Sequence, residues 1–557
     1  MGIIDLGAIA SEATLQRIAA ALEEMARNGT AFPSDEYVDA TFAALLDDTN
    51  TTEVFGKWWA LNSKSAATKY ARLERFFNMC AMNNNQQHTV QFYAAEASSN
   101  SQGTPLDWLA DKEAAPLATA SSIPAAGWDA ENRMTWYVRA NALSLADGTM
   151  NVLFVEGESG FDITGEIAPV YTFQLAPWFK ETVTEEYETR SWRATRAAGY
   201  APYAWDVAPD GTKRAMTWHP TFGGGLTGDG KLTSGAGRRA ATVQSATGGL
   251  TKARQWDAYE GLWADCDTKW LLYEWQHRHW HKENSGILEG CTGYYYTYQC
   301  AVAETDAERV ILTKDQASNL LVGSTVSVGD TERAAANVRA KILSIQTVTI
   351  DGAEYAAVWL DSVVTTTTAT NVSTVPWDTG ATEALPDHMD GAPVSLTGAK
   401  NPIRIAGVET LTGCYEIGLD PLYQVTANED GTFNYAVFEC RDSEKLAGSI
   451  GSGYQDTGIG ISNLSSGWHY VKAFVETPLG ILFPRLLDGS SSGYYRSAFN
   501  CADSAGVRCP GRFGYLYNWS AAGLACEYGN VAPSNGYWSG APRLAGSGKK
   551  RGEWAAS

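Results

Sequence analysis

The spacing of apolar residues predicts helices in three parts of the chain. Apolar side chains recur at helical spacing over 15–25 and 38–45, and Asn28-Gly29 ends the first of these runs. We expect further helices over 58–79 and 256–281. Residues 1–50 are therefore predicted to form a helical attachment or oligomerisation segment. Such a segment packs either on its own domain or on copies of itself, and the pattern fits both.

Alternation of apolar and polar residues predicts strands in the rest of the chain. In the region 51–310, the segments 136–141 and 151–155 have strand composition, and Asp147-Gly148 supplies the turn between them. Aromatic residues crowd together over 171–310, which indicates a mixed α/β region rich in aromatic side chains.

A compact all-β pattern begins at residue 311. The segments 345–350 and 355–360 alternate with a period of two, and Asp351-Gly352 between them predicts a hairpin. We interpret 311–375 as a small β-barrel insert, in which the threonine-rich stretch 365–374 is a connector.

Length supports a division into several domains. A chain of 557 residues is too long for one ordinary hydrophobic core. The sequence thus predicts an α+β multidomain protein with a helical N-terminus, a mixed α/β middle, a small β-barrel insert and a C-terminal domain. The predicted divisions are 1–50, 51–310, 311–375 and 380–557.

Charge and hydropathy exclude some classes of partner. The formal net charge is −21, and such an acidic chain repels nucleic acid and anionic membranes at long range. No run of about 18 apolar residues is present, so membrane insertion is not expected. The first residues lack a basic segment followed by a long apolar run, so we expect no signal peptide and synthesis in the cytoplasm.

Candidate metal and thiol chemistry is weak. His277 and His281 have the i, i+4 spacing of zinc ligands, but the sequence offers no clear third ligand, and a packed aromatic helix is favoured. The 9 cysteines include no CxxC pair. Cys501 and Cys509 either form a disulfide bond or, as we favour, remain buried thiols. We predict no catalytic residue, metal ion or cofactor.

The C-terminal region carries two segments that resemble known proteins. The first, 401–420, is similar to a segment of the formylglycine-generating-enzyme branch of the C-type lectin fold, although Cys414 and Ile417 depart from that pattern. The matching residues are Asn401, Pro402, Arg404, Gly407, Glu409, Gly413, Glu416 and Asp420.

The second segment, 513–544, resembles the variable region of proteins that are diversified by retroelements. Departures from that pattern are Leu516, Trp519, Gly540 and Ala541. The residues that keep its frame are Gly514, Ala522, Gly523, Ser534, Arg543 and Leu544. The order and separation of the two segments agree with those of the family.

This resemblance implies a C-type-lectin-like domain over 380–557, in which a fixed frame displays outward-pointing side chains that change without unfolding the domain. The candidate ligand-binding positions are rich in Tyr, Asn and Ser, as in adaptable antibody paratopes, although surface loops of glycine-rich β proteins share this composition. They are Tyr515, Tyr517, Asn518, Trp519, Ala521, Cys526, Tyr528, Asn530, Val531, Asn535, Tyr537, Trp538 and Ser539.

The resemblance also implies a function. We expect a phage tail protein of the virion that attaches to a host cell-surface receptor, either a protein or a glycan. It would contact other tail proteins, and a homotrimer would raise its avidity. Alternatives are a purely structural virion protein, a bacterial surface ligand-binding protein, and an oxidase of the formylglycine-generating kind. The oxidase would require Cys501 or Cys509 to be accessible and reactive.

Overall fold

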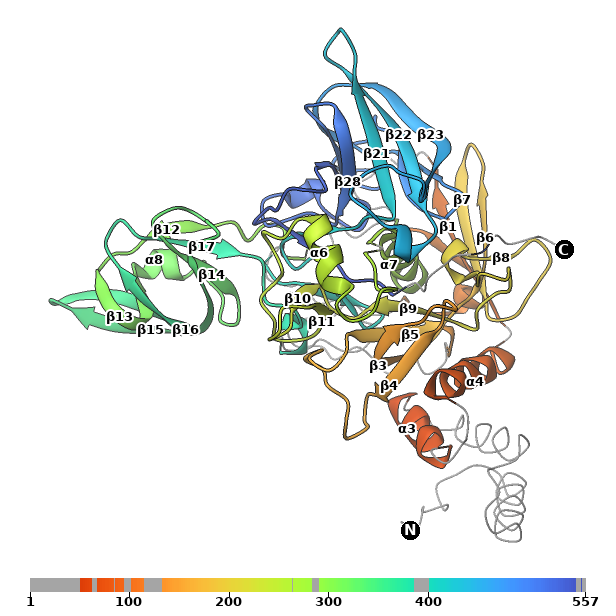
Figure 1. Cartoon of the computed structure of the whole chain (residues 1–557), viewed down its shortest axis with the longest axis horizontal. Coiled ribbons are helices and arrows are strands. Elements are labelled where there is room, and N and C mark those ends of the chain that lie inside the picture. Colours follow the sequence, from red (N-terminus) through yellow and green to blue (C-terminus); the bar gives the residue numbers. More distant parts are fainter. Residues whose placement is uncertain are drawn as a thin grey trace.

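The computed structural model shows an α+β, mostly β fold with several sheets (Figure 1). It describes residues 51–62, 68–84, 86–94, 102–114, 133–262, 264–282, 290–384, 400–546 and 552. The helices predicted within 1–50 lie outside the described residues. The α-helices of the described part are α3 (Thr51–Leu61), α4 (Lys69–Met82), α6 (Ala246–Ala253), α7 (Ala264–His279) and α8 (Lys314–Ala317).

Two antiparallel sheets form the first part of the fold. The five-stranded sheet has the order β2-β1-β7-β6-β8, and the four-stranded sheet has the order β4-β3-β5-β9. Their strands are β1 (Gln87–Tyr93), β2 (Thr104–Asp107), β3 (Tyr137–Ser144), β4 (Met150–Val155), β5 (Val170–Leu175), β6 (Trp178–Val183), β7 (Tyr187–Arg193), β8 (Ala201–Pro202) and β9 (Met216–Pro220). The predicted hairpin at Asp147-Gly148 is confirmed, because β3 pairs with β4 across this turn.

The single helix predicted over 58–79 is instead two helices. Helix α3 ends at Leu61, and α4 starts after Thr68, whose side chain accepts a hydrogen bond from the Ala71 N–H at 3.2 Å. Such a cap satisfies one of the free N–H groups at a helix start, so the chain begins a new helix at this point. Helix α4 packs against β4 and β5 of the four-stranded sheet.

A six-stranded antiparallel sheet, which we call the β-module, projects from the main body on the left of Figure 1. It has a separate core of buried apolar residues that extends from Cys300 to Val372. Its strands follow the order β12-β17-β14-β15-β16-β13. They are β12 (Thr297–Gln299), β13 (Glu304–Leu312), β14 (Thr325–Gly329), β15 (Val338–Ile350), β16 (Ala353–Thr366) and β17 (Asn371–Val375).

The sequence predicted the central hairpin of the β-module but not its limits. Asp351 and Gly352 have φ of 50° and 80° and join β15 to β16, as expected for a two-residue hairpin turn. The module begins before residue 311, since β12 precedes that position and β13 begins at Glu304. The threonine-rich stretch is not a connector: it contains β17, which pairs with β12 and β14. Threonine is β-branched and fits a paired strand well.

The C-terminal region forms a nine-stranded sheet together with short hairpins. Its main path is β23-β22-β21-β28-β29-β27-β24, and β20 pairs with both β28 and β30. The strands are β20 (Tyr415–Ile417), β21 (Pro421–Ala427), β22 (Phe433–Cys440), β23 (Tyr454–Leu464), β24 (Gly467–Tyr470), β27 (Ala498–Cys501), β28 (Gly506–Arg512), β29 (Glu527–Val531) and β30 (Gly540–Pro542). The hairpin strands of this region are β18 (Ile403–Ile405), β19 (Val408–Thr410), β25 (Ala473–Glu476) and β26 (Leu482–Leu486). A further two-stranded hairpin, β10 (Gly224–Leu226) and β11 (Leu232–Ser234), belongs to the middle of the chain.

Helix α7 lies at the centre of the main body, and its described side chains are buried on all sides. Trp270, Leu271 and Trp275 are buried in the main core, and the charged Arg278 is also fully buried. Arg278 donates to the Thr135 carbonyl at 2.8 Å and to the Glu274 carboxylate at 3.2 Å. The predicted helix over 256–281 was too long, because α7 begins only at Ala264 and ends at His279. The preceding helix α6 was not predicted.

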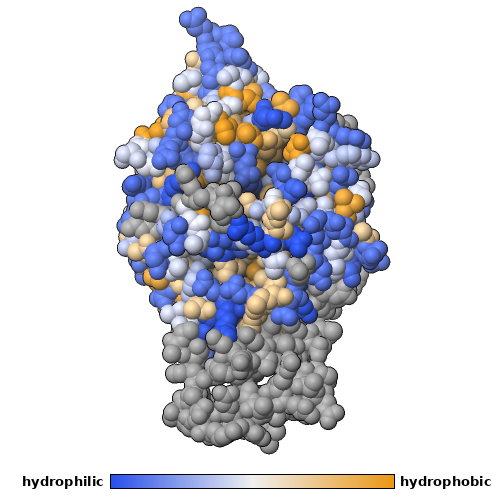
Figure 2. Space-filling model, turned by 90° about the vertical axis from the view of Figure 1, so that its right-hand side faces the viewer, coloured by the Kyte–Doolittle hydropathy of each residue, from blue (hydrophilic) through white to orange (hydrophobic). Residues whose placement is uncertain are grey.

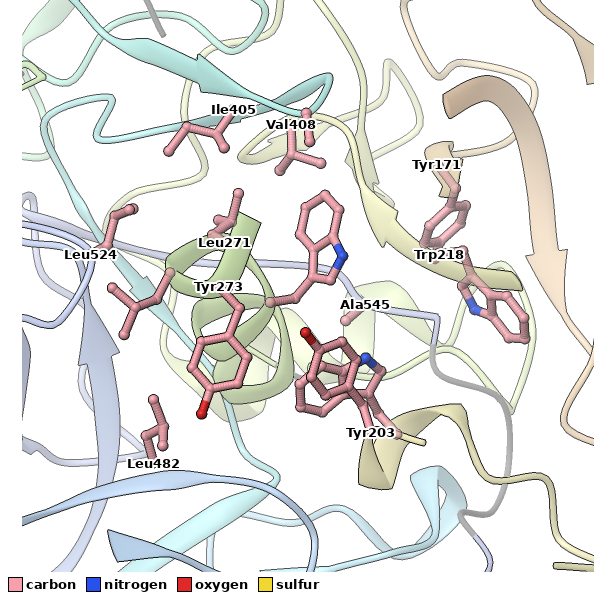
Figure 3. Close-up of a cluster of buried hydrophobic side chains, with 14 of the residues drawn as sticks. Tyr171, Tyr203, Trp218, Leu271, Tyr273, Ile405, Val408, Leu482, Leu524 and Ala545 are labelled. Atoms are coloured by element: carbon pink, nitrogen blue, oxygen red, sulfur yellow. The ribbon is translucent and has the colours of Figure 1, made fainter. Parts of the chain in front are cut away.

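The main core joins the middle of the chain to its C-terminal region. Figure 3 shows Tyr203 and Trp218 on one side of α7 and Leu482 and Leu524 on another, and all four belong to one cluster of buried residues. The predicted division between 51–310 and 380–557 is therefore not a division between hydrophobic cores. None of the helices in the described ranges is long and apolar enough to cross a lipid bilayer.

The face of the main body that is turned away from the β-module is mostly polar in its described part (Figure 2). Figure 2 views the side away from the β-module, where hydrophobic residues occur in small groups among hydrophilic ones. Isolated apolar residues are normal on a protein surface.

Candidate ligand-binding face

Most residues of the predicted frame are buried in the C-terminal region, whereas Ser534 is exposed. Strand β20 pairs in parallel with β30, so Glu416 lies opposite Ala541 and close to Arg543. Arg543 forms an ion pair with Glu416, and both side chains are buried. Arg543 also donates to the carbonyl oxygens of Glu409 at 3.2 Å and Pro220 at 2.7 Å. This pair therefore ties the two C-terminal segments to each other and to the middle of the chain.

A second buried group holds the 401–410 hairpin. The Glu409 carboxylate accepts hydrogen bonds from the N–H groups of Gly380 and Thr382 at 2.8 Å and 3.0 Å. Burial raises the pKa of this carboxyl above its ordinary value. Arg404 is buried and forms an ion pair with Glu383. Asp420 is also buried, whereas Asn401 is only half-buried.

The predicted frame glycines have backbone conformations that favour glycine. Gly407, Gly413, Gly514 and Gly523 have φ of 76°, 98°, 102° and 129°. At Gly514, a Cβ would also lie 2.7 Å from the Cβ of Ala522. A larger residue there is excluded both by its backbone conformation and by contact. Gly514 thus fixes the start of the predicted variable segment against Ala522.

Most of the candidate binding positions reach the surface. The exposed ones are Tyr517, Trp519 and Asn535. The half-buried ones are Tyr515, Asn518, Ala521, Tyr528, Asn530, Tyr537, Trp538 and Ser539.

Cys526 and Val531 do not fit this prediction, because both are buried. Strand β29 alternates buried and half-buried residues, so Tyr528 and Asn530 point outward while Glu527, Gly529 and Val531 point inward. Cys526 immediately precedes this strand and is fully buried. Val531 still contributes to the candidate site, since it is one of the residues that line a surface pocket.

This pocket follows from the register of neighbouring strands. Trp468 on β24 lies opposite Asn500 on β27, and Asn500 lies opposite Tyr528 on β29. The row continues through Gly511 on β28 to Ile417 on β20. Residues opposite one another on adjacent strands share one face of a sheet.

Gly511 lies in the middle of this row, where the lack of a side chain lets Tyr415 and Val531 approach closely. A Cβ at Gly511 would lie 3.1 Å from both the Tyr415 Cβ and a Val531 methyl group. The pocket itself is open and has a volume of about 240 Å³. It is lined by Tyr415, Ile417, Trp468, Asn500, Tyr515, Tyr528, Val531, Tyr537, Ser539 and Gly540.

The rings around this pocket are packed against one another. Tyr415 stacks on Tyr528 with ring centroids 4.8 Å apart, and the Trp468 ring centroid lies 6.0 Å from that of Tyr528. Tyr515 contacts Tyr415 at 5.1 Å and meets Trp538 edge-on at 5.6 Å. Mutual contacts of this kind restrict each ring, so the face is preorganised for binding.

The β-module side of the molecule extends this aromatic face. Tyr295, just before β12, lies 5.0 Å from Tyr517 and 6.1 Å from Trp538. The Arg333 guanidinium lies 3.8 Å from the Tyr295 ring centroid and 5.1 Å from that of Trp538. Arg333 is held in turn by the carbonyls of Thr374 and Tyr296, each at 2.9 Å. The candidate face therefore continues from the C-terminal sheet onto the β-module.

The thiols of this region are inaccessible. Cys501, Cys509 and Cys526 are buried thiols. Burial raises the pKa of the Cys501 and Cys509 thiols, which disfavours the nucleophilic thiolate. An oxidase that uses these cysteines is not favoured by this geometry.

The histidines at the end of α7 are part of the packing. The ring nitrogens of His277 and His88 are 2.7 Å apart, and His277 stacks on Trp192. Burial lowers the pKa of His88 to about 3. His281 lies beyond the end of the helix, so the i, i+4 face that zinc ligands would share is not formed. In the described part of the chain, no cluster of three or more His, Cys, Asp or Glu side chains is arranged to hold a metal ion.

Several residues of the candidate face were not predicted. Trp468, Asn500, Tyr295 and Arg333 lie far from the variable segment in sequence and reach it only through strand pairing and the packing of the β-module. The aromatic run Tyr294–Tyr296 was a visible signal, but its position could not be inferred from local pattern. No protein-family model matches the chain, and no curated protein is significantly similar to it in sequence. Function therefore has to be argued from this geometry.

Proposed function

We propose that this chain is a non-enzymatic receptor-binding protein of a phage tail, which attaches the virion to its host through a diversifiable face on a C-type-lectin-like domain. One observation carries the proposal. Five of the candidate positions, Tyr515, Tyr528, Val531, Tyr537 and Ser539, line one open aromatic pocket, while the frame residues Glu416 and Arg543 are buried.

This arrangement separates the requirements of folding from those of binding. Substitutions at Tyr517 or Asn535 change exposed side chains and leave the buried ion pair intact. Surface substitutions away from buried contacts usually change stability by less than about 0.5 kcal/mol. A retroelement could therefore vary such positions while the frame still folds. A homotrimer within the tail would present several copies of the face and raise the avidity for a host cell.

Binding of the fluorescently labelled chain to intact host bacteria tests this proposal. Tyr517→Ala removes an exposed ring of the face, and we expect at least about tenfold weaker binding, as for the loss of an interface anchor. Tyr93→Ala is the matched control, because Tyr93 and Tyr517 are 52% and 59% exposed. Each also contacts one tyrosine ring, at 5.1 Å and 5.0 Å.

Equal binding by both variants, or no binding by the parent chain, would contradict the proposal and favour a structural virion protein. A separate genomic test concerns diversification. We expect a reverse-transcriptase gene nearby, together with a near-copy of the coding sequence for 514–544 that differs at adenines. Without that copy, the claim of diversification fails.

A further inference from the structure

Two residues outside the predicted variable segment form one wall of the pocket. Trp468 on β24 and Asn500 on β27 are register partners, and Asn500 is also the partner of Tyr528 on β29. Both line the pocket together with Tyr515 and Tyr537 from the variable segment. Diversification of 515–539 would leave this wall unchanged. The pocket therefore combines a constant wall with variable neighbours.

The chemistry of the lining is aromatic and neutral. Its polar side chains are the Asn500 amide and the hydroxyls of Ser539 and of the lining tyrosines, and none of the described lining residues is Asp, Glu, Lys or Arg. Burial raises the pKa of the Tyr515 and Tyr528 hydroxyls, so both stay protonated at neutral pH. A charged ligand would find no compensating charge on these walls, and desolvating it would be costly.

The size of the pocket limits what it holds. Its volume of about 240 Å³ is below the roughly 300–1,000 Å³ of pockets that enclose drug-sized ligands. One six-membered ring is therefore a better fit than an extended ligand, and the open side lets the rest of a longer molecule continue outward.

A pyranose ring matches these features. It has apolar C–H groups on its faces, which pack on aromatic rings, and hydroxyl groups at its edge, which exchange hydrogen bonds with amides and hydroxyls. The ring centroids of Tyr528 and Trp468 lie 6.0 Å apart, and these two rings would pack on the sugar. The Asn500 amide, on the strand next to Trp468, would exchange hydrogen bonds with the sugar hydroxyls. An apolar side chain of a protein receptor would use the rings but leave the Asn500 amide unpaired, at a cost in binding free energy.

We infer that the pocket binds one uncharged pyranose ring of a surface glycan, with Trp468 and Asn500 as constant contacts and the variable residues as determinants of which sugar is accepted. This inference rests on the proposed function and names its ligand class. Different variable segments would then alter selectivity among neutral sugars without abolishing sugar binding.

An array of neutral, sialylated and sulfated oligosaccharides, followed by titration calorimetry with the best neutral one, tests the inference. We expect binding to neutral glycans, and at least about tenfold weaker binding by Trp468→Ala. Asn500→Ala should weaken binding in the same direction. Tyr93→Ala is the control, because Tyr93 is an exposed aromatic residue (52%, against 39% for Trp468) and only Trp468 lines the pocket.

Unchanged thermal stability of the Trp468→Ala variant shows that lost binding is not lost folding, and Trp468→Phe should restore part of the affinity. Exclusive binding to charged glycans, or unchanged binding by Trp468→Ala, overturns the inference. Cell binding that is abolished by Tyr517→Ala but unaffected by Trp468→Ala keeps the proposed function and rejects the sugar, in favour of a protein receptor. If neither variant lost cell binding or glycan binding, both the proposed function and the inference about the sugar would be rejected.

Discussion

Glu260 is a buried carboxyl group whose ionisation opposes folding. Its oxygens accept hydrogen bonds from the Ser144 N–H at 2.7 Å and the Tyr171 hydroxyl at 2.8 Å. Burial nevertheless raises its pKa from 4.5 to about 7. The folded state therefore binds this proton more tightly than the unfolded state, and the free energy of unfolding falls as pH rises between these two values.

Glu260→Gln should remove this dependence on pH. Relative to the parent chain, the variant is expected to gain up to about 3 kcal/mol in free energy of unfolding between about pH 5 and about pH 8. Urea denaturation at the two pH values measures the change. If the free energy of unfolding differed between variant and parent by the same amount at pH 5 and at pH 8, Glu260 would already be ionised at pH 5 in the folded protein.

Other single residues show how far sequence reasoning reached. The resemblance pointed to Glu416 and Arg543 as frame residues, and both are buried in one ion pair. It also pointed to Cys526 as a binding position, and this was wrong because the residue is buried beside β29. Trp468 was missed because its contact with Tyr528 depends on the pairing of β24 with β27, which no local pattern encodes.

At the scale of elements, the β15–β16 turn allows a test of how a glycine's backbone conformation affects stability. Gly352 has φ of 80°, and nothing lies within 4 Å of an added Cβ. Gly352→Ala should therefore destabilise the β-module by about 1 kcal/mol through its backbone conformation alone. Gly56 lies in the exposed middle of α3 with equally open space, so Gly56→Ala should stabilise its helix by up to about 1 kcal/mol. Thermal unfolding of both variants measures the two opposite shifts, and a shift of the same sign in both would contradict this account.

The sequence located the β15–β16 hairpin correctly but misplaced the ends of helix α7, and the difference has a physical reason. An Asp-Gly pair with positive φ at both residues is a local signal, and it located the β15–β16 hairpin correctly. Helix α7 has described side chains buried on all sides, including Arg278 and His277, and so it lacks the one-sided apolar stripe that marks helix limits. Its ends were consequently misplaced, although its existence was expected.

At the scale of the whole molecule, the buried apolar residues gather in two separate cores, whereas the sequence predicted a series of four domains. The main core unites residues from Val54 to Ala545, whereas the β-module has its own. A small cluster that includes Tyr294, Trp377 and Leu516 lies where the two meet. Composition and turn signals could locate the β-module, because it is continuous in sequence. They could not reveal that segments hundreds of residues apart pack around α7.

Two cores of this kind should unfold as two cooperative units. Leu271 is buried in the main core and Leu360 in that of the β-module, so Leu→Ala at each makes the same chemical change in a different unit. Each substitution should cost about 2–5 kcal/mol through lost burial and the resulting cavity. Scanning calorimetry should show two unfolding transitions. Leu360→Ala should lower the midpoint temperature of one, and Leu271→Ala that of the other.

If both variants shifted one shared transition, contacts at Tyr294 and Leu516 would couple the two cores into one unit. If the main core itself divided into two transitions, the middle and C-terminal regions would be separate domains after all.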